Sequence, residues 1–72
     1  MEYVRIKSYY PDGRFTFCEH LYSGADHVSA ILRFRAEYPA HHDCILVAET
    51  IDADDPKNKE YFSVCLRCGC VH

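Results

Sequence analysis

The residues with the clearest chemical potential are the cysteines and histidines close to the end of the 72-residue sequence. Cys65 and Cys68 have the C-x-x-C spacing that brings two thiolates to one metal ion through a tight turn, and Gly69 follows, where the backbone can approach closely. This pair is half of a tetrahedral zinc site. The other two ligands have three candidate sources: Cys70 with His72, Cys18 with His20, or His41 with Cys44.

The zinc interpretation competes with a simpler one, in which Cys44 and Cys65 are small buried hydrophobic residues. Residues 1–7 include charged side chains, unlike a secretory signal, so we expect a cytoplasmic protein in a reducing compartment, where disulfides are rare. The 5 cysteines also cannot all pair with one another. A bound zinc ion would be structural, because so short a chain has a thin core.

Three segments alternate between apolar and polar residues, as half-buried strands do: 2–10, 14–22 and 60–67. The first two flank Pro11-Asp12-Gly13, a turn sequence, and are predicted to form a hairpin. Residues 44–52 are β-branched and apolar, which is typical of a buried strand.

A helix is predicted from Ser23 or Gly24 to about Tyr38, because apolar residues recur at helical spacing and Pro39 ends the pattern. Residues 53–59 hold only turn-forming and charged types and are expected to be a loop. The predicted fold is therefore one α+β domain over residues 1–72. Its elements follow the order ββαββ, with an antiparallel-rich four-stranded sheet and one helix packed on one face.

Because one helix covers only one face of such a sheet, the other face is predicted to be open. The alternation places Val4, Ile6, Phe15, Phe17 and Leu21 in the core. The open face is then rich in aromatic and basic residues and has no acid. We expect it to bind a partner through Tyr3, Arg5, Lys7, Tyr9, His20, Tyr22, Tyr61 and Arg67.

Acidic residues are concentrated elsewhere, between positions 49 and 60. The net charge of −3 therefore hides a separation of charge. Asp52, Asp54 and Asp55 form the centre of this acidic segment, which we expect to contact a basic partner.

The sequence favours binding over catalysis, since it contains no glycine-rich phosphate loop, G-x-S-x-G or H-E-x-x-H motif. Tyrosine and arginine are enriched at protein interfaces, so a protein partner is the first hypothesis. The alternative is a zinc-stabilised module that stacks single-stranded nucleic acid on its tyrosines. An ordinary solvated sheet face is the third interpretation. No membrane span is predicted, and a homodimer remains open.

The segment Ile31-Leu32-Arg33-Phe34-Arg35-Ala36-Glu37-Tyr38-Pro39, with the strand after it, resembles a pattern recurrent in small phage and mobile-element accessory proteins. Some anti-CRISPR proteins among them are similar in size and in hairpin–helix–strand order. The resemblance covers about residues 3–52 and implies a regulator or stoichiometric inhibitor that occupies the surface of a nuclease complex. Separately, residues 65–69 look like one of the two knuckles of the zinc-ribbon class.

Overall fold

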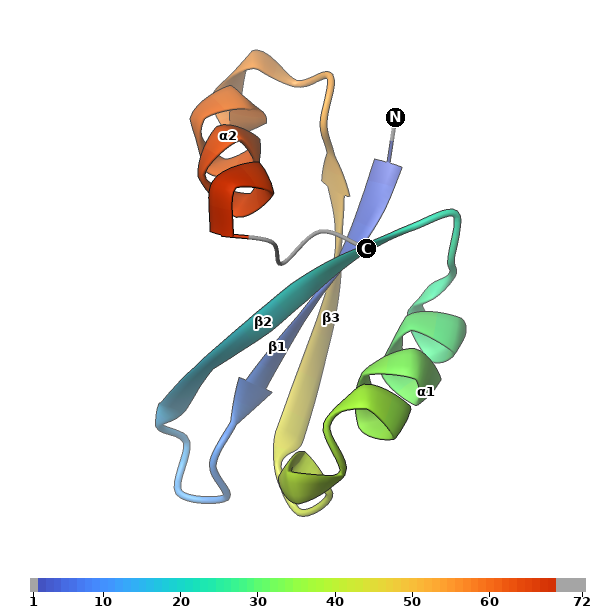
Figure 1. The fold of residues 1–72 in the computed structure, drawn as a ribbon, viewed down its shortest axis with the longest axis vertical. Coiled ribbons are helices and arrows are strands. Elements are labelled where there is room, and N and C mark those ends of the chain that lie inside the picture. The colour runs from blue at the N-terminus through green and yellow to red at the C-terminus, as the bar shows by residue number, and fades with distance from the viewer. Residues whose placement is uncertain (1, 69–72) are drawn as a thin grey trace.

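The computed structural model describes the backbone of residues 2–68 and the side chains of residues 2–64. The described chain forms a three-stranded sheet and two α-helices (Figure 1). The elements in chain order are β1 (Glu2–Tyr9), β2 (Phe15–Ser23), α1 (His27–Glu37), the 3-10 turn η1 (Pro39–His41), β3 (Ile45–Asp52), the 3-10 turn η2 (Pro56–Asn58) and α2 (Lys59–Cys68). The strand order is β2-β1-β3, and β1 is antiparallel to both neighbours.

The expected fourth strand at residues 60–67 is wrong, because this segment belongs to helix α2. Phe62 is buried, whereas Val64, two positions later, is 54% exposed. Such a difference is normal on a helix, where residues two apart point in different directions. The signals that start helix α2 lie directly before it in the sequence. The Asp55 side chain accepts a hydrogen bond from the Lys57 amide at 3.0 Å, and Pro56 opens η2 directly before the helix. The ββαββ order and the four-stranded sheet with one helix are therefore incorrect.

The β1–β2 hairpin closes over the predicted turn and carries a bulge near it. The Tyr10 amide donates to the Arg14 carbonyl at 2.8 Å, and Gly13 has a φ of 93°. Lys7 pairs with Glu19, but Tyr9 pairs with Phe15, so residues 16–18 of β2 lie opposite Ser8 alone. The Thr16 hydroxyl donates to the Ser8 carbonyl at 2.9 Å, which holds the bulge against β1.

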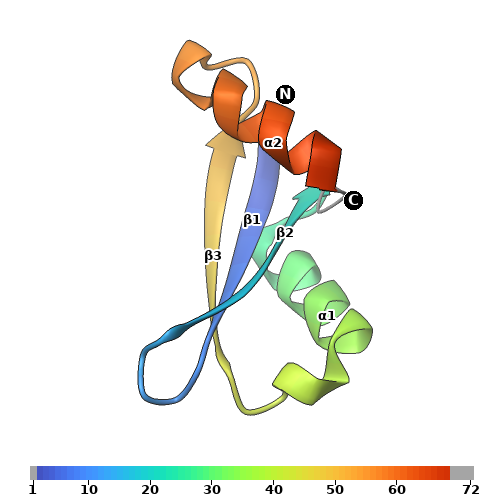
Figure 2. The same ribbon diagram turned by 60° about the vertical axis from the view of Figure 1, so that its left-hand side comes forward.

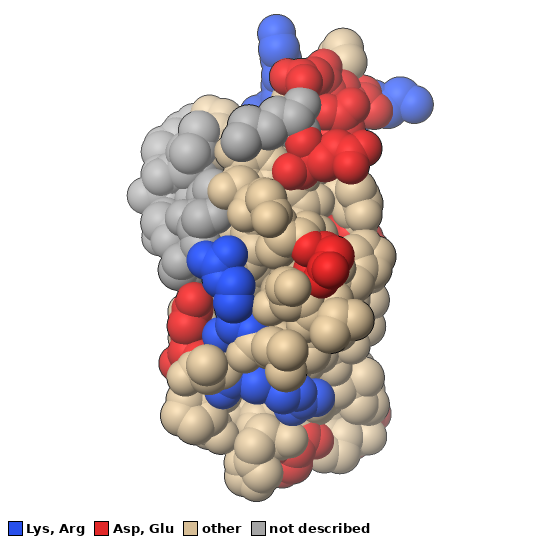
Figure 3. Space-filling view, turned by 90° about the vertical axis from the view of Figure 1, so that its right-hand side faces the viewer, with Lys and Arg blue, Asp and Glu red and all other residues tan. Residues whose placement is uncertain are grey.

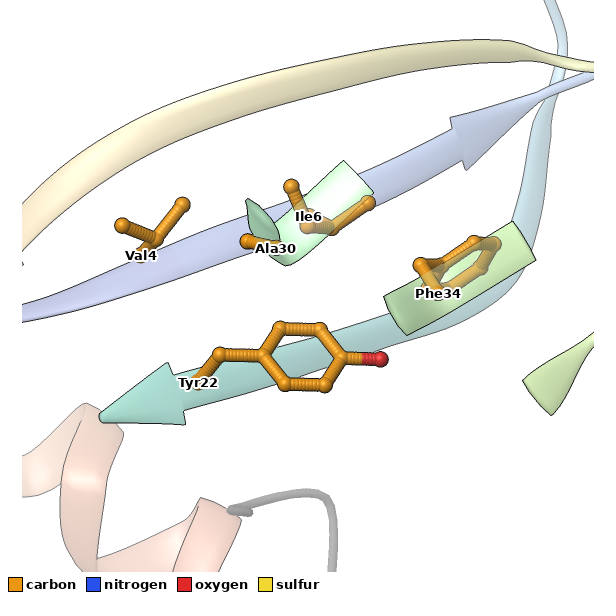
Figure 4. Close-up of a cluster of buried hydrophobic side chains, with 5 residues drawn as sticks. All are labelled: Val4, Ile6, Tyr22, Ala30 and Phe34. Atoms are coloured by element: carbon orange, nitrogen blue, oxygen red, sulfur yellow. The ribbon is translucent and has the colours of Figure 1, made fainter. Parts of the chain in front are cut away.

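Helix α1 packs on one face of the sheet and forms the first hydrophobic cluster. Asp26, just before the helix, accepts a hydrogen bond from the Ser29 amide at 2.7 Å and is its N-cap, so α1 begins later than the expected Ser23 or Gly24. The cluster consists of Val4, Ile6, Tyr22, Ala30 and Phe34 (Figure 4). All but Val4 are completely buried.

Helix α2 packs on the opposite face, near the end where β3 finishes (Figure 2). Phe62 buries itself there against Leu21 and Ile51, and its ring centroid lies 5.0 Å from that of Tyr3. Tyr3 alternates with Val4 along β1, so the two helices cover different faces of the sheet. The fold has three layers, with α1 and α2 on either side of the strands.

The expected division of β2 between the two faces is also wrong. Val4 pairs with Tyr22 and Arg5 with Leu21, and residues directly opposite in antiparallel strands share a face. Tyr22 is therefore beneath α1, while Leu21 lies on the face of Arg5. Because successive side chains alternate, a change of one residue in the pairing register moves the whole strand's side chains to the other face.

Neither helix, within the described part of the chain, is long and apolar enough to cross a lipid bilayer.

Candidate functional site

No described residue covers part of the sheet face that carries α2. The pairing of the strands sets its side chains in rows, because directly opposed residues share a face. Tyr3 and Ile51 form a row beneath Phe62, whereas Tyr9 lies between Phe15 and Ile45 at the far end of the strands. The neighbouring row contains Lys7 and Val47. We call the uncovered apolar surface the aromatic platform; it consists of Tyr9, Phe15, Phe17, Ile45 and Val47.

Aromatic rings follow one another along this platform. The ring centroid of Tyr9 lies 5.5 Å from that of Phe15, and the centroid of Phe15 lies 5.2 Å from that of Phe17. Phe17 is 88% exposed, Ile45 52% and Val47 37%. A shallow hollow of about 510 Å³ lies beside these rings, between Tyr10, Arg14 and Phe17. Adjoining exposed apolar side chains of this kind mark interaction surfaces more often than isolated ones do.

The backbone at Phe17 is strained. Its φ is 63°, the only positive φ of a non-glycine residue in the described part of the chain. This conformation costs a bulky residue about 1 kcal/mol or more relative to the ordinary regions. Hydrophobic burial does not compensate for this cost, because the side chain is almost fully exposed. The bulge therefore presents a large hydrophobic ring to solvent at a cost in stability.

Two basic residues border the platform. The Lys7 ammonium nitrogen lies 5.8 Å from the centroid of the Phe15 ring, and the Arg14 guanidinium lies 5.2 Å from that of Tyr10. Arg14 also forms an ion pair with Asp12, with a 2.7 Å separation between Nε and Oδ2. Lys7 therefore supplies the positive charge nearest the centre of the platform.

Three of the expected partner-binding residues instead attach α2 to the sheet. The Arg5 guanidinium forms an ion pair with Glu49 and lies 5.4 Å from the centroid of the Tyr61 ring. The Tyr61 hydroxyl donates to Glu19 Oε2 at 3.2 Å. Tyr3 packs against Phe62, as described above. Arg67 belongs to α2, but its side chain lies outside the described residues.

Two further expected residues, His20 and Tyr22, lie under α1, so the structure does not place them on an open face. The Tyr22 hydroxyl donates to Glu37 Oε2 at 3.2 Å, and the Arg33 guanidinium lies 4.7 Å from the Tyr22 ring centroid. Burial, and then the Glu37 carboxylate, raise the pKa of Tyr22 well above its ordinary value. The ring of His20 is hydrogen-bonded to the Tyr38 hydroxyl.

The aspartates of the acidic segment lie at the connection between β3 and α2. Figure 3 shows acidic side chains gathered at that end of the molecule, with basic ones beside them. Asp52 Oδ1 accepts from the Asp54 amide at 2.9 Å, as Asp55 does from Lys57. Lys57 and Lys59 follow directly in the sequence. Asp52 and Asp55 thus stabilise the turn that leads into α2, and the segment is less purely acidic than its aspartates suggest.

The proposed zinc ligands are not brought together in the described part of the chain. Among residues 2–64, no three histidine, cysteine or acidic side chains are arranged to hold a metal ion, so the alternatives Cys18, His20, His41 and Cys44 form no such group. Cys65 and Cys68 lie in a helical backbone, which replaces the expected tight turn between them. Their side chains, together with Cys70 and His72, lie outside the described residues.

A buried polar pair beneath η1 has the chemistry of a nucleophile and a base, but not the access. Ser8 Oγ and His41 Nδ1 are hydrogen-bonded at 3.0 Å, yet Ser8 is completely buried. Cys18 lies on the same side of the sheet, where burial and, second, the neighbouring Cys44 thiol raise its pKa. A higher pKa leaves less of the reactive thiolate. The Ser8–His41 hydrogen bond therefore serves to satisfy buried polar groups.

The sequence pattern assigned the most exposed residues of the platform to the core. Phe15 and Phe17 alternate with polar residues as core residues do, and Ile45 and Val47 lie in an apolar run. The signal that distinguishes them is their pairing register, which a single sequence does not reveal.

Comparison of the chain with protein-family models, curated proteins and solved structures finds no match.

Proposed function

We propose that the protein is a non-catalytic binding module that docks a protein partner on the aromatic platform and acts as a regulator or stoichiometric inhibitor. The observation that carries this proposal is Phe17, an 88% exposed ring held at a positive φ by a bulge. Strained backbone and exposed aromatic groups both lower stability, and their coincidence is expected where a surface is kept for recognition. Aromatic residues are also the usual centres of binding energy in protein interfaces.

The composition of the platform favours a protein partner over single-stranded nucleic acid. Ile45 and Val47 extend the aromatic row with aliphatic groups, which suit a buried interface core but offer no stacking surface. Among the described side chains, only Lys7 lies over the rings of the platform, whereas a nucleic-acid groove needs a row of cations along the phosphates. The partner that fits is an apolar protein surface with a carboxylate placed to meet Lys7.

The test is affinity capture with purified protein as bait, followed by titration of the purified partner. Phe17→Ala should weaken binding roughly 30-fold or more, because loss of a central aromatic residue costs about 2 kcal/mol. Val64→Ala is the matched control, since Val64 is also exposed but lies on α2. The Val64→Ala variant should bind the partner with the same affinity as the wild type.

Two results would count against the proposal. One is a partner that binds Phe17→Ala and the wild type equally well. The other is tight binding of a single-stranded oligothymidine that Phe17→Ala removes and that falls steeply with salt, which would establish nucleic acid as the ligand.

A further inference from the structure

Strand β3 has an outer edge that no other described element pairs with. The strand order is β2-β1-β3, so β3 forms its hydrogen bonds with β1 on one side only. Figure 2 shows β3 at one margin of the sheet, and α1 packs on one face against β3 and β1. No described strand pairs with the outer side of residues 45–51, so their outward backbone N–H and C=O groups can accept a further strand.

This edge lacks the features by which proteins usually prevent edge pairing. Residues 45–52 contain no proline, glycine, lysine or arginine, and their pairing with β1 runs without a bulge from Tyr9↔Ile45 to Glu2↔Asp52. The charge of Glu49 is balanced by its ion pair with Arg5. The other edge strand, β2, is bulged at residues 16–18 and is much less suitable for pairing.

Exposed apolar side chains flank the β3 edge on both faces of the sheet. On one face they are Ile45 and Val47 of the platform. On the other there is Val28 of α1, which is 68% exposed. The opposite flank of α1 faces β2, because Arg33 and Glu37 contact Tyr22.

The start of α1 confirms which flank lies toward β3. Nε2 of His27 and the Thr50 hydroxyl are hydrogen-bonded at 2.9 Å. Val28 borders the same hollow as Thr50. At 100° per residue, Val28 falls on the β3 side of α1, whereas Leu32 lies opposite the buried residues Ala30 and Phe34 and faces solvent.

We propose that β3 pairs with β3 of a second copy of this chain, antiparallel and about a two-fold axis, so that the two sheets become continuous. This symmetry keeps each face on its own side, so α1 lies on the same face as its copy, with Val28 on the flank toward it. Ile45 and Val47 approach their equivalents on the other face.

Charge supports a second copy as the occupant. Residues 45–48 carry no charge, so self-pairing through them sets no like charges opposite one another. A charged foreign strand would find no counter-charge there. The dimer would present two aromatic platforms on one face. The pairing does not depend on the proposed function, because Phe17 lies on β2, away from this edge.

The first experiment measures the mass of the full chain under reducing conditions by sedimentation equilibrium, from about 1 µM to about 1 mM. The wild type should associate to a dimer. Val47→Glu should raise the dimer dissociation constant roughly tenfold or more, because it brings two carboxylates close together beside the two-fold axis. Val64→Glu makes a comparable change on α2 and should leave it unaltered.

The second experiment needs no variant and reports on β3 directly. Amide hydrogen exchange of the wild type is compared at concentrations below and above the dissociation constant. Outward-facing amides of β3 should become protected in the dimer, while those of β2 should not change. A chain that stays monomeric up to about 1 mM would overturn the proposal. So would a dimer in which β3 exchange does not depend on concentration, or one that Val47→Glu leaves intact.

Phe17→Ala separates the two proposals. If the platform binds a partner and β3 forms the dimer, this variant loses the partner and still dimerises. Loss of dimerisation in Phe17→Ala would place the self-association at the platform and contradict the β3 assignment.

Discussion

The ring of Phe17 lies 5.2 Å from that of Phe15, with the planes inclined by 52°, and this pair ends the aromatic row that crosses the uncovered part of the sheet. The contact positions the Phe17 side chain without burying it. Since the same residue has a positive φ, its conformation lowers stability while its ring stays accessible. Stability and binding are thus expected to respond in opposite directions to changes at this position.

Phe17→Gly should stabilise the fold. Glycine adopts a positive φ without the steric cost that phenylalanine incurs, and little burial is lost. We expect a gain of about 1 kcal/mol, or about 4–8 °C in Tm, measured by circular dichroism. The partner affinity should fall at the same time. Lower stability in Phe17→Gly would show that the Phe15 contact outweighs the backbone strain.

Phe62→Ala should destabilise the protein and release α2. Phe62 is the one buried apolar residue among the described side chains of α2, and it packs against Leu21 and Ile51. Truncation of a buried phenylalanine costs about 3 kcal/mol. Urea unfolding measures the loss, and Val64→Ala in the same helix should change stability by less than about 0.5 kcal/mol. Equal effects of the two changes would contradict the observed orientation of α2.

Tyr22→Phe should remove part of the loss of stability at alkaline pH. Burial raises the pKa of Tyr22 in the folded state, so the unfolded chain loses this proton first as pH rises. Stability therefore falls with rising pH above the ordinary tyrosine pKa of about 10. Chemical unfolding between about pH 9 and 11 should give a shallower slope for Tyr22→Phe. At pH 7 the variant should lose about 1 kcal/mol with the Glu37 hydrogen bond.

An unchanged alkaline slope in Tyr22→Phe would mean that the phenol ionises equally easily in both states. Tyr10→Phe is a suitable control, because it removes the same hydroxyl from an exposed tyrosine.

The zinc content of cysteine variants should distinguish the C-terminal cysteines from Cys18 as metal ligands. The sequence predicts about one zinc ion per chain, held by the C-terminal residues, when the protein is purified without chelator. Cys68→Ser should then abolish the metal, and Cys18→Ser should leave it unchanged, because Cys18 packs on the face covered by α1 whereas Cys65 and Cys68 belong to α2 on the other face. Zinc lost on Cys18→Ser would contradict that arrangement. Absence of metal, with the fold unchanged in Cys68→Ser, would end the zinc hypothesis.

The hairpin, α1 and β3 follow from local sequence signals. Alternation over residues 2–10 and 14–22, the Pro11-Asp12-Gly13 turn, and Pro39 after the apolar helical pattern specify these elements within a few residues. The same alternation misled at residues 60–67. There Asp55 and Pro56 were the better guide, since capping and a fixed φ act through the local backbone.

The distribution of side chains between the two faces needed the tertiary structure. Tyr22 and Leu21 are neighbours in the sequence, and both are completely buried, but on opposite faces under different helices. Two covered faces remove the contrast between apolar and polar positions on which the periodicity argument depends. The bulge at residues 16–18 then brings Phe17 to the surface.

What the sequence by itself determined is an α+β chain with a hairpin, one helix and a following strand, because these depend on contacts within a few residues. Only the tertiary structure decided which aromatic residues face solvent. Strand register and the position of α2 are set by pairing between distant segments, and the sequence carries that information only through the packing it produces.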